Sequence, residues 1–119
     1  MIQTSFKTQH PLEKRKEEST KILTKYPGKI PIIVEKNNRT NMPDISKNKF
    51  LAPSDLTIGQ FLVVIRNRID ITEHEALFLF VNNNILPPTS AMLSQLYNDY
   101  KDEDNFLYVT YCSENTFGH

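Results

Sequence analysis

The segment at residues 30–35 constrains the fold more than any other part of this chain. In a strand, successive side chains point to opposite faces, so a strand with one face in water alternates apolar and polar residues. This segment is instead apolar on both faces, with Ile30, Ile32 and Val34 on one and Pro31 and Ile33 on the other. We therefore expect a strand that is covered on both sides. Pro31 has no N–H group, so it should lie where no ladder bond is needed.

The segments around this strand predict the order of the other elements. Thr57 and Gln60 form a capping-box pair at the start of a strong helix, with Ile58, Phe61, Leu62, Ile65 and Ile69 as its buried stripe. In chain order we expect a helix at 11–26, strands at 30–35 and 49–52, this helix from Thr57, a strand at 77–81, a turn at 82–84, a helix after 87–89 and a strand at 106–111.

This order predicts an α+β fold, a ubiquitin-like β-grasp with an additional N-terminal helical segment. The central helix would cover one face of the sheet and the N-terminal helix the other, which accounts for a first strand that is apolar on both sides. We expect three parts: an N-terminal helical extension at 1–26 packed on the sheet, the β-grasp core at 27–112, and a flexible C-terminal tail at 113–119.

Composition excludes several classes of function. The chain has 119 residues, with 14 basic and 14 acidic side chains, and a general nucleic-acid binder would usually be strongly basic. Cys112 is the single cysteine, which favours a reducing compartment. The first eleven residues contain no apolar run, and no apolar stretch is long enough to span a bilayer. We expect a cytoplasmic protein that binds no nucleic acid.

Enzymatic activity would need a catalytic group, and the sequence offers few. Cys112 is the only thiol nucleophile, and His10, His74 and His119 are scattered along the chain. A Cys–His pair could meet only in space, and cysteine is more often a small buried hydrophobe. No second histidine lies at metal-ligand spacing from His74. We therefore expect neither an enzyme nor a metal site.

Six stretches of the chain resemble the ubiquitin-like modifiers of autophagy, the family that includes GABARAP. They are HPLEKRKEES, KYPGKIPIIVEK, KFLAPSDLTIGQFLVVIRNRI, ALFLFVNN, LPPTSAMLSQLY and KDEDNFLYVTYCSENTFG. The resemblance covers nearly the whole chain, from Phe6 to Gly118. The family's C-terminal motif, an aromatic residue and a glycine, stands here as Phe117-Gly118, followed by His119.

The resemblance implies a conjugation pathway at this terminus. A cysteine protease would remove His119, and E1-like and E2-like enzymes would then carry the Gly118 carboxylate to phosphatidylethanolamine on autophagosomal membranes. No other cofactor is implied. Glycine suits such chemistry because a backbone without Cβ can approach a nucleophile closely. The alternative is an unconjugated ubiquitin-like adapter that binds short linear motifs.

The resemblance also implies a docking surface for peptides with an aromatic residue, two spacers and an aliphatic residue. Such a peptide would add as a strand to the edge formed by residues 49–51. Its aromatic pocket would comprise Glu18, Ile22, Pro31, Ile33, Lys49, Leu51 and Phe106, and its aliphatic pocket Phe50, Ala52, Pro53, Leu56, Phe61 and Val64. Lys29, Lys47 and Arg68 would attract acidic residues beside the motif. Leu77, Phe78, Leu79 and Phe80 would form a second docking face, for a helical motif.

Each of these residues also has a purely structural interpretation. An isolated apolar residue such as Ile33 or Phe106 usually belongs to the core, and a lysine usually lies on a solvated face. Two positions depart from the family pattern: Ala52 replaces a larger aliphatic residue, which predicts a wider or shallower aliphatic pocket, and Asn105 replaces a glycine in a turn. Asparagine tolerates a positive φ, so we expect that turn to survive.

Overall fold

The computed structural model describes residues 5–38 and 40–113. A short helix, α1 (Phe6–Gln9), comes first, and the other elements follow the predicted order: α2 (Leu12–Lys25), β1 (Lys29–Lys36), β2 (Lys49–Pro53), α3 (Ile58–Arg66), β3 (Phe78–Val81), α4 (Leu93–Tyr100) and β4 (Leu107–Cys112). The four strands form one sheet in the order β2-β1-β4-β3. β1 is antiparallel to β2 and parallel to β4, and β3 is antiparallel to β4.

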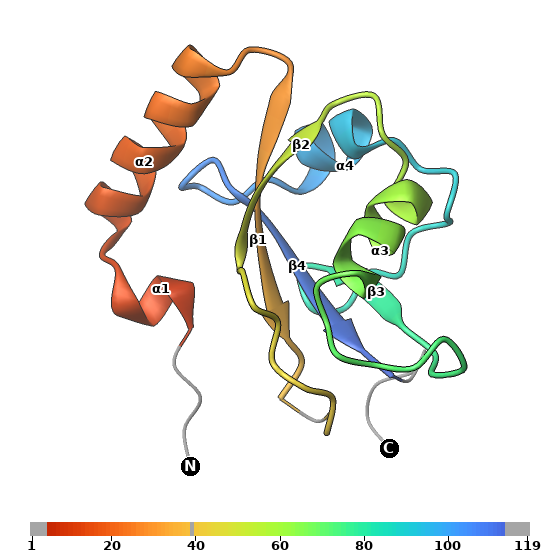
Figure 1. Cartoon of the computed structure of the whole chain (residues 1–119). Coiled ribbons are helices and arrows are strands. Elements are labelled where there is room, and N and C mark those ends of the chain that lie inside the picture. Colours follow the sequence, from red (N-terminus) through yellow and green to blue (C-terminus); the bar gives the residue numbers. More distant parts are fainter. Residues whose placement is uncertain (1–4, 39, 114–119) are drawn as a thin grey trace.

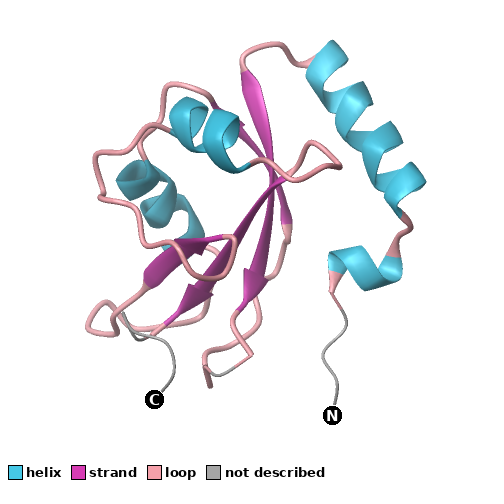
Figure 2. Ribbon diagram, turned by 180° about the vertical axis from the view of Figure 1, so that it is seen from behind, coloured by secondary structure: helices cyan, strands magenta, loops and turns pink. Residues whose placement is uncertain are grey.

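Helices lie on both sides of the sheet, as the apolar first strand predicts. Figures 1 and 2 show α1 and α2 on one side and α3 and α4 on the other. The α+β class and the ubiquitin-like mixed sheet are thereby confirmed.

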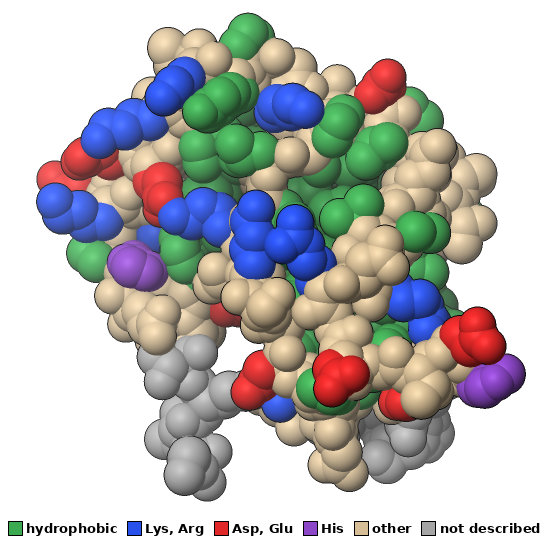
Figure 3. Space-filling view, in the orientation of Figure 1, with side chains coloured by type: hydrophobic (Ala, Val, Ile, Leu, Met, Phe, Trp, Pro, Cys, Tyr) green, Lys and Arg blue, Asp and Glu red, His purple; other side chains and the backbone are tan. Residues whose placement is uncertain are grey.

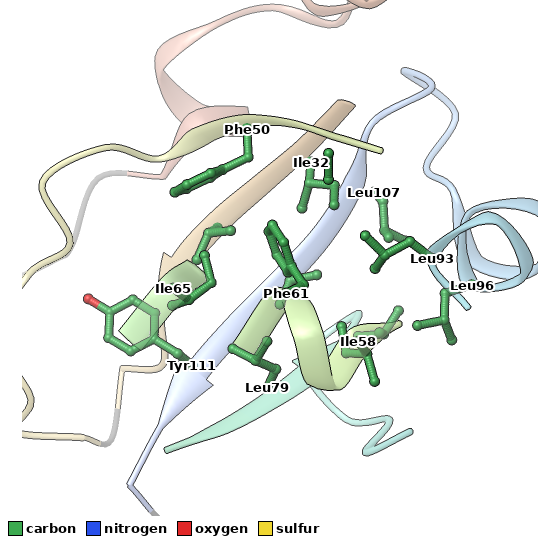
Figure 4. Close-up of a cluster of buried hydrophobic side chains, with 14 of the residues drawn as sticks. Ile32, Phe50, Ile58, Phe61, Ile65, Leu79, Leu93, Leu96, Leu107 and Tyr111 are labelled. Atoms are coloured by element: carbon green, nitrogen blue, oxygen red, sulfur yellow. The ribbon is translucent and has the colours of Figure 1, made fainter. Parts of the chain in front are cut away.

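Two apolar cores correspond to the two faces of β1. The larger core lies under α3 and α4 and includes Ile32, Phe61 and Ile65, which are at most 1% exposed (Figure 4). The smaller core lies under α1 and α2 and comprises five residues, Phe6, Ile22, Ile33, Phe106 and Tyr108. The two-sided pattern of β1 therefore reflects two separate cores, of which the one beneath the N-terminal helices is small.

Pro31 occupies the predicted kind of position, although β1 is an interior strand. The Asn37 N–H donates to the Tyr111 carbonyl at 3.0 Å, so the odd-numbered backbone nitrogens of β1 face β4. The pairing with β4 begins at Ile32, one residue after Pro31. At the same spacing, a backbone N–H at position 31 would donate to the Asn105 carbonyl. That carbonyl instead accepts a hydrogen bond from Tyr97 Oη at 2.8 Å. The missing donor therefore leaves no orphaned acceptor.

Several element boundaries differ from the predicted ones. Pro11 is the N-cap of α2 and not its first residue. α3 ends at Arg66, because the Arg68 N–H bonds to the Ile65 carbonyl in a tighter turn. Ile69 is buried, but it belongs to the segment that follows the helix. Leu77 likewise lies in the core just before β3 begins.

The asparagine turns behave as expected. Asn82 and Asn83 have φ values of 52° and 70°, and Asn105 has a φ of 68°. These are left-handed conformations that asparagine tolerates better than most residues. The turn at Asn105 thus survives without glycine.

Candidate functional site

The outer edge of β2 is the first feature of the candidate site. β2 pairs with β1 on one side and is the last strand of the sheet on the other. The Val34 N–H bonds to the Asn48 carbonyl at 2.7 Å, and the Ser54 N–H bonds to the Gly28 carbonyl at 3.0 Å. Because hydrogen-bonded pairs alternate along an antiparallel ladder, Phe50 and Ala52 direct their backbone groups toward β1. The N–H and C=O groups of Lys49 and Leu51 face the open edge.

A hollow of about 680 Å³ lies between α2 and this edge. Of the predicted aromatic pocket, the structure brings Glu18, Ile22, Lys49 and Leu51 together around it. Pro31, Ile33 and Phe106 are buried, and the last two pack with Ile22 in the smaller core instead of lining the hollow. The loop before β2 completes the lining with Ile45, Ser46, Lys47 and Asn48.

Sequence reasoning missed Ile45, Ser46 and Asn48 because they lie in a loop without periodicity. The start of this loop is anchored on the rest of the fold. Met42 is only 5% exposed, and Tyr111 Oη donates to the Pro43 carbonyl at 2.8 Å. Burial raises the pKa of Tyr111 to about 12, so the phenol remains a hydrogen-bond donor well above neutral pH.

Charged side chains stand at the mouth of the hollow. Lys49 forms an ion pair with Glu18, which links β2 to α2, and both side chains are more than a third exposed. An exposed pair of this kind contributes little to stability, so a ligand could displace it at small cost. The Lys47 ammonium lies 5.2 Å from the centre of the Phe50 ring. Lys and Arg side chains run across the middle of this face, with hydrophobic side chains above and beside them (Figure 3).

The predicted aliphatic pocket divides into a core and a surface. Phe50, Ala52 and Phe61 are at most 5% exposed, and the rings of Phe50 and Phe61 meet edge to face with centres 5.7 Å apart. Pro53 and Leu56 are half-buried, and Val64 is 37% exposed. The accessible part of the predicted aliphatic pocket therefore consists of the last three residues.

The predicted basic contacts are all exposed. Lys29 begins β1 opposite Pro53, Lys47 precedes β2, and Arg68 follows the end of α3. These positions place Lys29 and Lys47 at the two ends of the β2 edge.

The predicted second docking face is only partly accessible. An apolar hollow of about 150 Å³ is lined by Leu77, Phe78, Leu79 and parts of α3 and the 86–89 loop. Phe80 does not line it and is only 2% exposed. Gly59 packs closely against the 86–89 loop here, because a Cβ at this position would lie 3.0 Å from the Thr89 carbonyl oxygen.

A buried polar cluster joins α2 to the loop before β4. Asp104 is fully buried and accepts hydrogen bonds from Arg15 Nη1 at 2.6 Å, Tyr108 Oη at 2.5 Å and the Phe106 N–H at 2.8 Å. Ser19 Oγ donates to the Asp104 carbonyl at 2.6 Å. We call Arg15, Ser19, Asp104 and Tyr108 the Asp104 cluster.

Hydrogen bonding within this cluster shifts the pKa values of Arg15 and Tyr108. Burial alone would lower the pKa of Arg15, but the hydrogen bonds to Asp104 and Tyr108 raise it above its usual value. Burial and the Asp104 carboxylate raise the pKa of Tyr108. The sequence signal was available but weak: Arg15 falls at helical spacing from Ser19 and Ile22, on the buried face of α2.

Among the described residues, the candidate catalytic groups differ in burial. Cys112 is buried in β4, whereas His10 and His74 are exposed. Within residues 5–38 and 40–113 no three side chains are arranged to hold a metal ion. No helix of this part of the chain is long and apolar enough to cross a membrane. Phe117, Gly118 and His119, the predicted processing site, lie outside the described residues.

A mixed sheet in the order β2-β1-β4-β3 with α3 packed across one face is the β-grasp of a ubiquitin-like protein, and α1 and α2 are added on the other face. Comparison with known families identifies the branch: the model of "Autophagy protein Atg8 ubiquitin like" matches residues 14–118. The chain belongs to the Atg8 family. It is therefore an autophagy-related ubiquitin-like modifier or adapter and not an enzyme, as the sequence resemblance implies.

Curated relatives and solved structures agree with this assignment. The chain is 54% identical to autophagy-related protein 8c of Arabidopsis thaliana, with 99% of this chain and 98% of that protein covered. It is 53% identical to autophagy-related protein 8A of Oryza sativa subsp. indica over the same shares. The crystal structure of Trypanosoma brucei ATG8 superposes with a TM-score of 0.88 at 39% identity, covering 98% of this chain and all of the other.

A further structure shows a relative with a bound peptide. Plasmodium falciparum Atg8, solved in complex with a Plasmodium falciparum Atg3 peptide, has a TM-score of 0.86 and 38% identity, covering 94% of this chain and 98% of that one.

Proposed function

We propose that this protein is a conjugated modifier of the autophagy pathway. A cysteine protease cleaves after Gly118, an E1-like and an E2-like enzyme transfer the Gly118 carboxylate, and phosphatidylethanolamine receives it on autophagosomal membranes. There the protein drives membrane formation and recruits cargo receptors and adaptors. Membership of the Atg8 family supports this proposal, as does the Atg3 peptide bound to the Plasmodium falciparum relative.

The proposal assigns separate tasks to the three parts of the chain. The extension at 1–26 supplies the α2 wall of the hollow, and the core at 27–112 supplies the β2 edge. The tail at 113–119 carries the reacting carboxylate at Gly118, where the absence of a Cβ admits close approach of a nucleophile. Phe117 would anchor the tail in the processing enzymes. The protein would be cytoplasmic until the lipid attaches it to the membrane.

The observation that carries the docking proposal is the open β2 edge between two apolar surfaces. A peptide that adds to this edge would bond to the outward backbone groups of Lys49 and Leu51. Residues three apart in a strand point to opposite faces. An aromatic-x-x-aliphatic motif would therefore send its aromatic side chain into the hollow beside α2. Its aliphatic side chain would reach the surface of Pro53, Leu56 and Val64.

Two further features support recognition of such peptides. Lys29 and Lys47 at the ends of the edge, with Arg68 beyond α3, would attract acidic residues that flank the motif. Ala52 would leave the α3-side pocket wide enough to favour leucine over valine. Equal leucine-to-valine preference in the wild type and in Ala52→Val would contradict that role.

A second, smaller docking site is favoured by the hollow at Leu77, Phe78 and Leu79. Its lining is almost wholly apolar and one Leu-sized side chain would fill it. We propose that an amphipathic helix inserts such a side chain there. Leu86, which is 46% exposed at the rim, offers the test: Leu86→Asp should abolish binding of a helical peptide and leave binding at the β2 edge unchanged.

The deciding experiment is the C-terminal mass of the protein from membrane and soluble fractions of starved host cells, beside a Gly118→Ala control. Conjugation requires a membrane form that ends at Gly118 with phosphatidylethanolamine attached, and no such form for the control. A protein that keeps His119 and never carries lipid would instead be an unconjugated adapter that binds short linear motifs.

A further inference from the structure

The Asp104 cluster lies beside the hollow without lining it. Arg15 and Ser19 reach Asp104 from α2, and the next residue on the same helix face, Ile22, borders the hollow together with Glu18. We propose that the cluster is a positioning device: it fixes the distance between α2 and β2 and thereby makes the hollow selective for an aromatic side chain. This inference rests on the proposed docking function.

Apolar packing alone provides α2 with little to hold it. The three buried residues of α2 are Arg15, Ser19 and Ile22, and of these only Ile22 belongs to the smaller core. The other two each donate a hydrogen bond to Asp104. Two of the three buried attachments of α2 are therefore hydrogen bonds to one residue, and those bonds are directional in a way that an apolar contact is not.

The other wall of the hollow is held independently. β2 pairs with β1 through five residue pairs, from Lys29–Pro53 to Ile33–Lys49, so its place is set by the sheet. The ion pair between Glu18 and Lys49 joins the two walls across the mouth, but it is exposed and weak. The width of the hollow therefore depends on α2, whose two buried polar side chains both bond to Asp104.

Asp104 also supports the residues behind the hollow. Its carboxylate accepts the Phe106 N–H at 2.8 Å, and Phe106 packs with Ile22 in the smaller core. A change at Asp104 would therefore disturb both the helix and the core beneath it. Arg15 and Ser19 are the better targets, because their side chains connect to the cluster from α2 alone.

The test compares two synthetic peptides that differ only at the first anchor, tryptophan in one and leucine in the other. Dissociation constants are measured by fluorescence anisotropy for the full chain and for Arg15→Met, with thermal unfolding to confirm that each variant folds. Lys16→Met removes a charge from the exposed side of the same helix and is the matched control. Arg15→Lys retains the cation and should rescue part of the effect.

We expect Arg15→Met to weaken binding of the tryptophan peptide about tenfold, which is within the usual range of coupling between two sites. Binding of the leucine peptide should change far less. The aromatic preference should therefore collapse, because the larger side chain needs the α2 wall. Lys16→Met should leave both affinities unchanged. Ser19→Ala removes one hydrogen bond and keeps the ion pair, so it should move the preference in the same direction by less.

Two results would overturn the proposal, and they are distinguishable. If Arg15→Met and Ser19→Ala fold and keep the wild-type preference, the cluster serves stability alone while the docking function stands. Should Arg15→Met fail to fold, Ser19→Ala decides the question by itself. If the wild type binds neither peptide, the docking function is refuted and this inference with it.

Discussion

A proline at Leu51 should separate peptide docking from sheet stability. The Leu51 N–H faces the open edge, so its loss leaves the β1–β2 ladder intact. A docked strand would lose one main-chain hydrogen bond, a net contribution of about 0.5–1.5 kcal/mol. That corresponds to roughly a two- to twelvefold weaker affinity.

The side chain of Leu51 must be accounted for separately. It is 37% exposed and lines the hollow, so its removal also weakens binding. Leu51→Ala removes most of the side chain and keeps the N–H group. The backbone contribution is therefore the difference between Leu51→Pro and Leu51→Ala, measured by isothermal titration calorimetry with one aromatic-x-x-aliphatic peptide.

Ala52→Pro is the matched control for stability. The Ala52 N–H points toward Ile30 in β1, and its side chain is 4% exposed. Loss of this N–H group breaks a ladder bond and leaves a buried carbonyl unpaired. The free energy of unfolding, measured in urea, should fall by about 1–3 kcal/mol. The free energy of unfolding of Leu51→Pro should lie within about 1 kcal/mol of that of Leu51→Ala.

Two outcomes would refute this reasoning. Equal loss of stability in Leu51→Pro and Ala52→Pro would mean that the outward direction of the Leu51 N–H is wrong. Equal peptide affinity in Leu51→Pro and Leu51→Ala would mean that the peptide does not add as a strand to this edge.

Three further predictions concern stability. Phe61→Ala should lower the free energy of unfolding by about 3–5 kcal/mol in urea titration, because the ring is 1% exposed in the larger core. Asn105→Val should cost about 1–3 kcal/mol in thermal unfolding because its φ is 68°, while Asn105→Gly should cost nothing. Tyr111→Phe should cost about 1 kcal/mol through the lost bond to the Pro43 carbonyl. Because the folded pKa of Tyr111 is raised to about 12, its contribution is fully present below the ordinary value near 10 and is lost as pH rises through about 12; wild type but not Tyr111→Phe should show this loss.

Each of these has a result that contradicts it. A loss below about 1 kcal/mol for Phe61→Ala would place the ring outside a packed core. Equal stability of the two Asn105 variants would show that the turn does not need a positive φ. Parallel alkaline unfolding of wild type and Tyr111→Phe would remove the phenol as the cause.

The class of the fold could be predicted from local patterns. An apolar first strand predicts two covering layers, and the capping box at Thr57 and Gln60 predicts the start of α3; both are present, with the Gln60 N–H donating to Thr57 Oγ1 at 3.1 Å. Such signals depend on residues a few positions apart. The end of α3 differs from its predicted stripe, because the helix terminates at Arg66 in one tight turn.

Only the tertiary structure decided which residues of the candidate site meet. Ile33 and Phe106 differ little from Ile22 in type, yet they are buried in the smaller core while Ile22 also borders the hollow. Arg15 and Asp104 are 89 positions apart, and their contact follows from the packing of α2 on the sheet. The reason is physical: hydrophobic spacing states that a side chain leaves water, whereas its neighbours are set by contacts between segments that are distant along the chain.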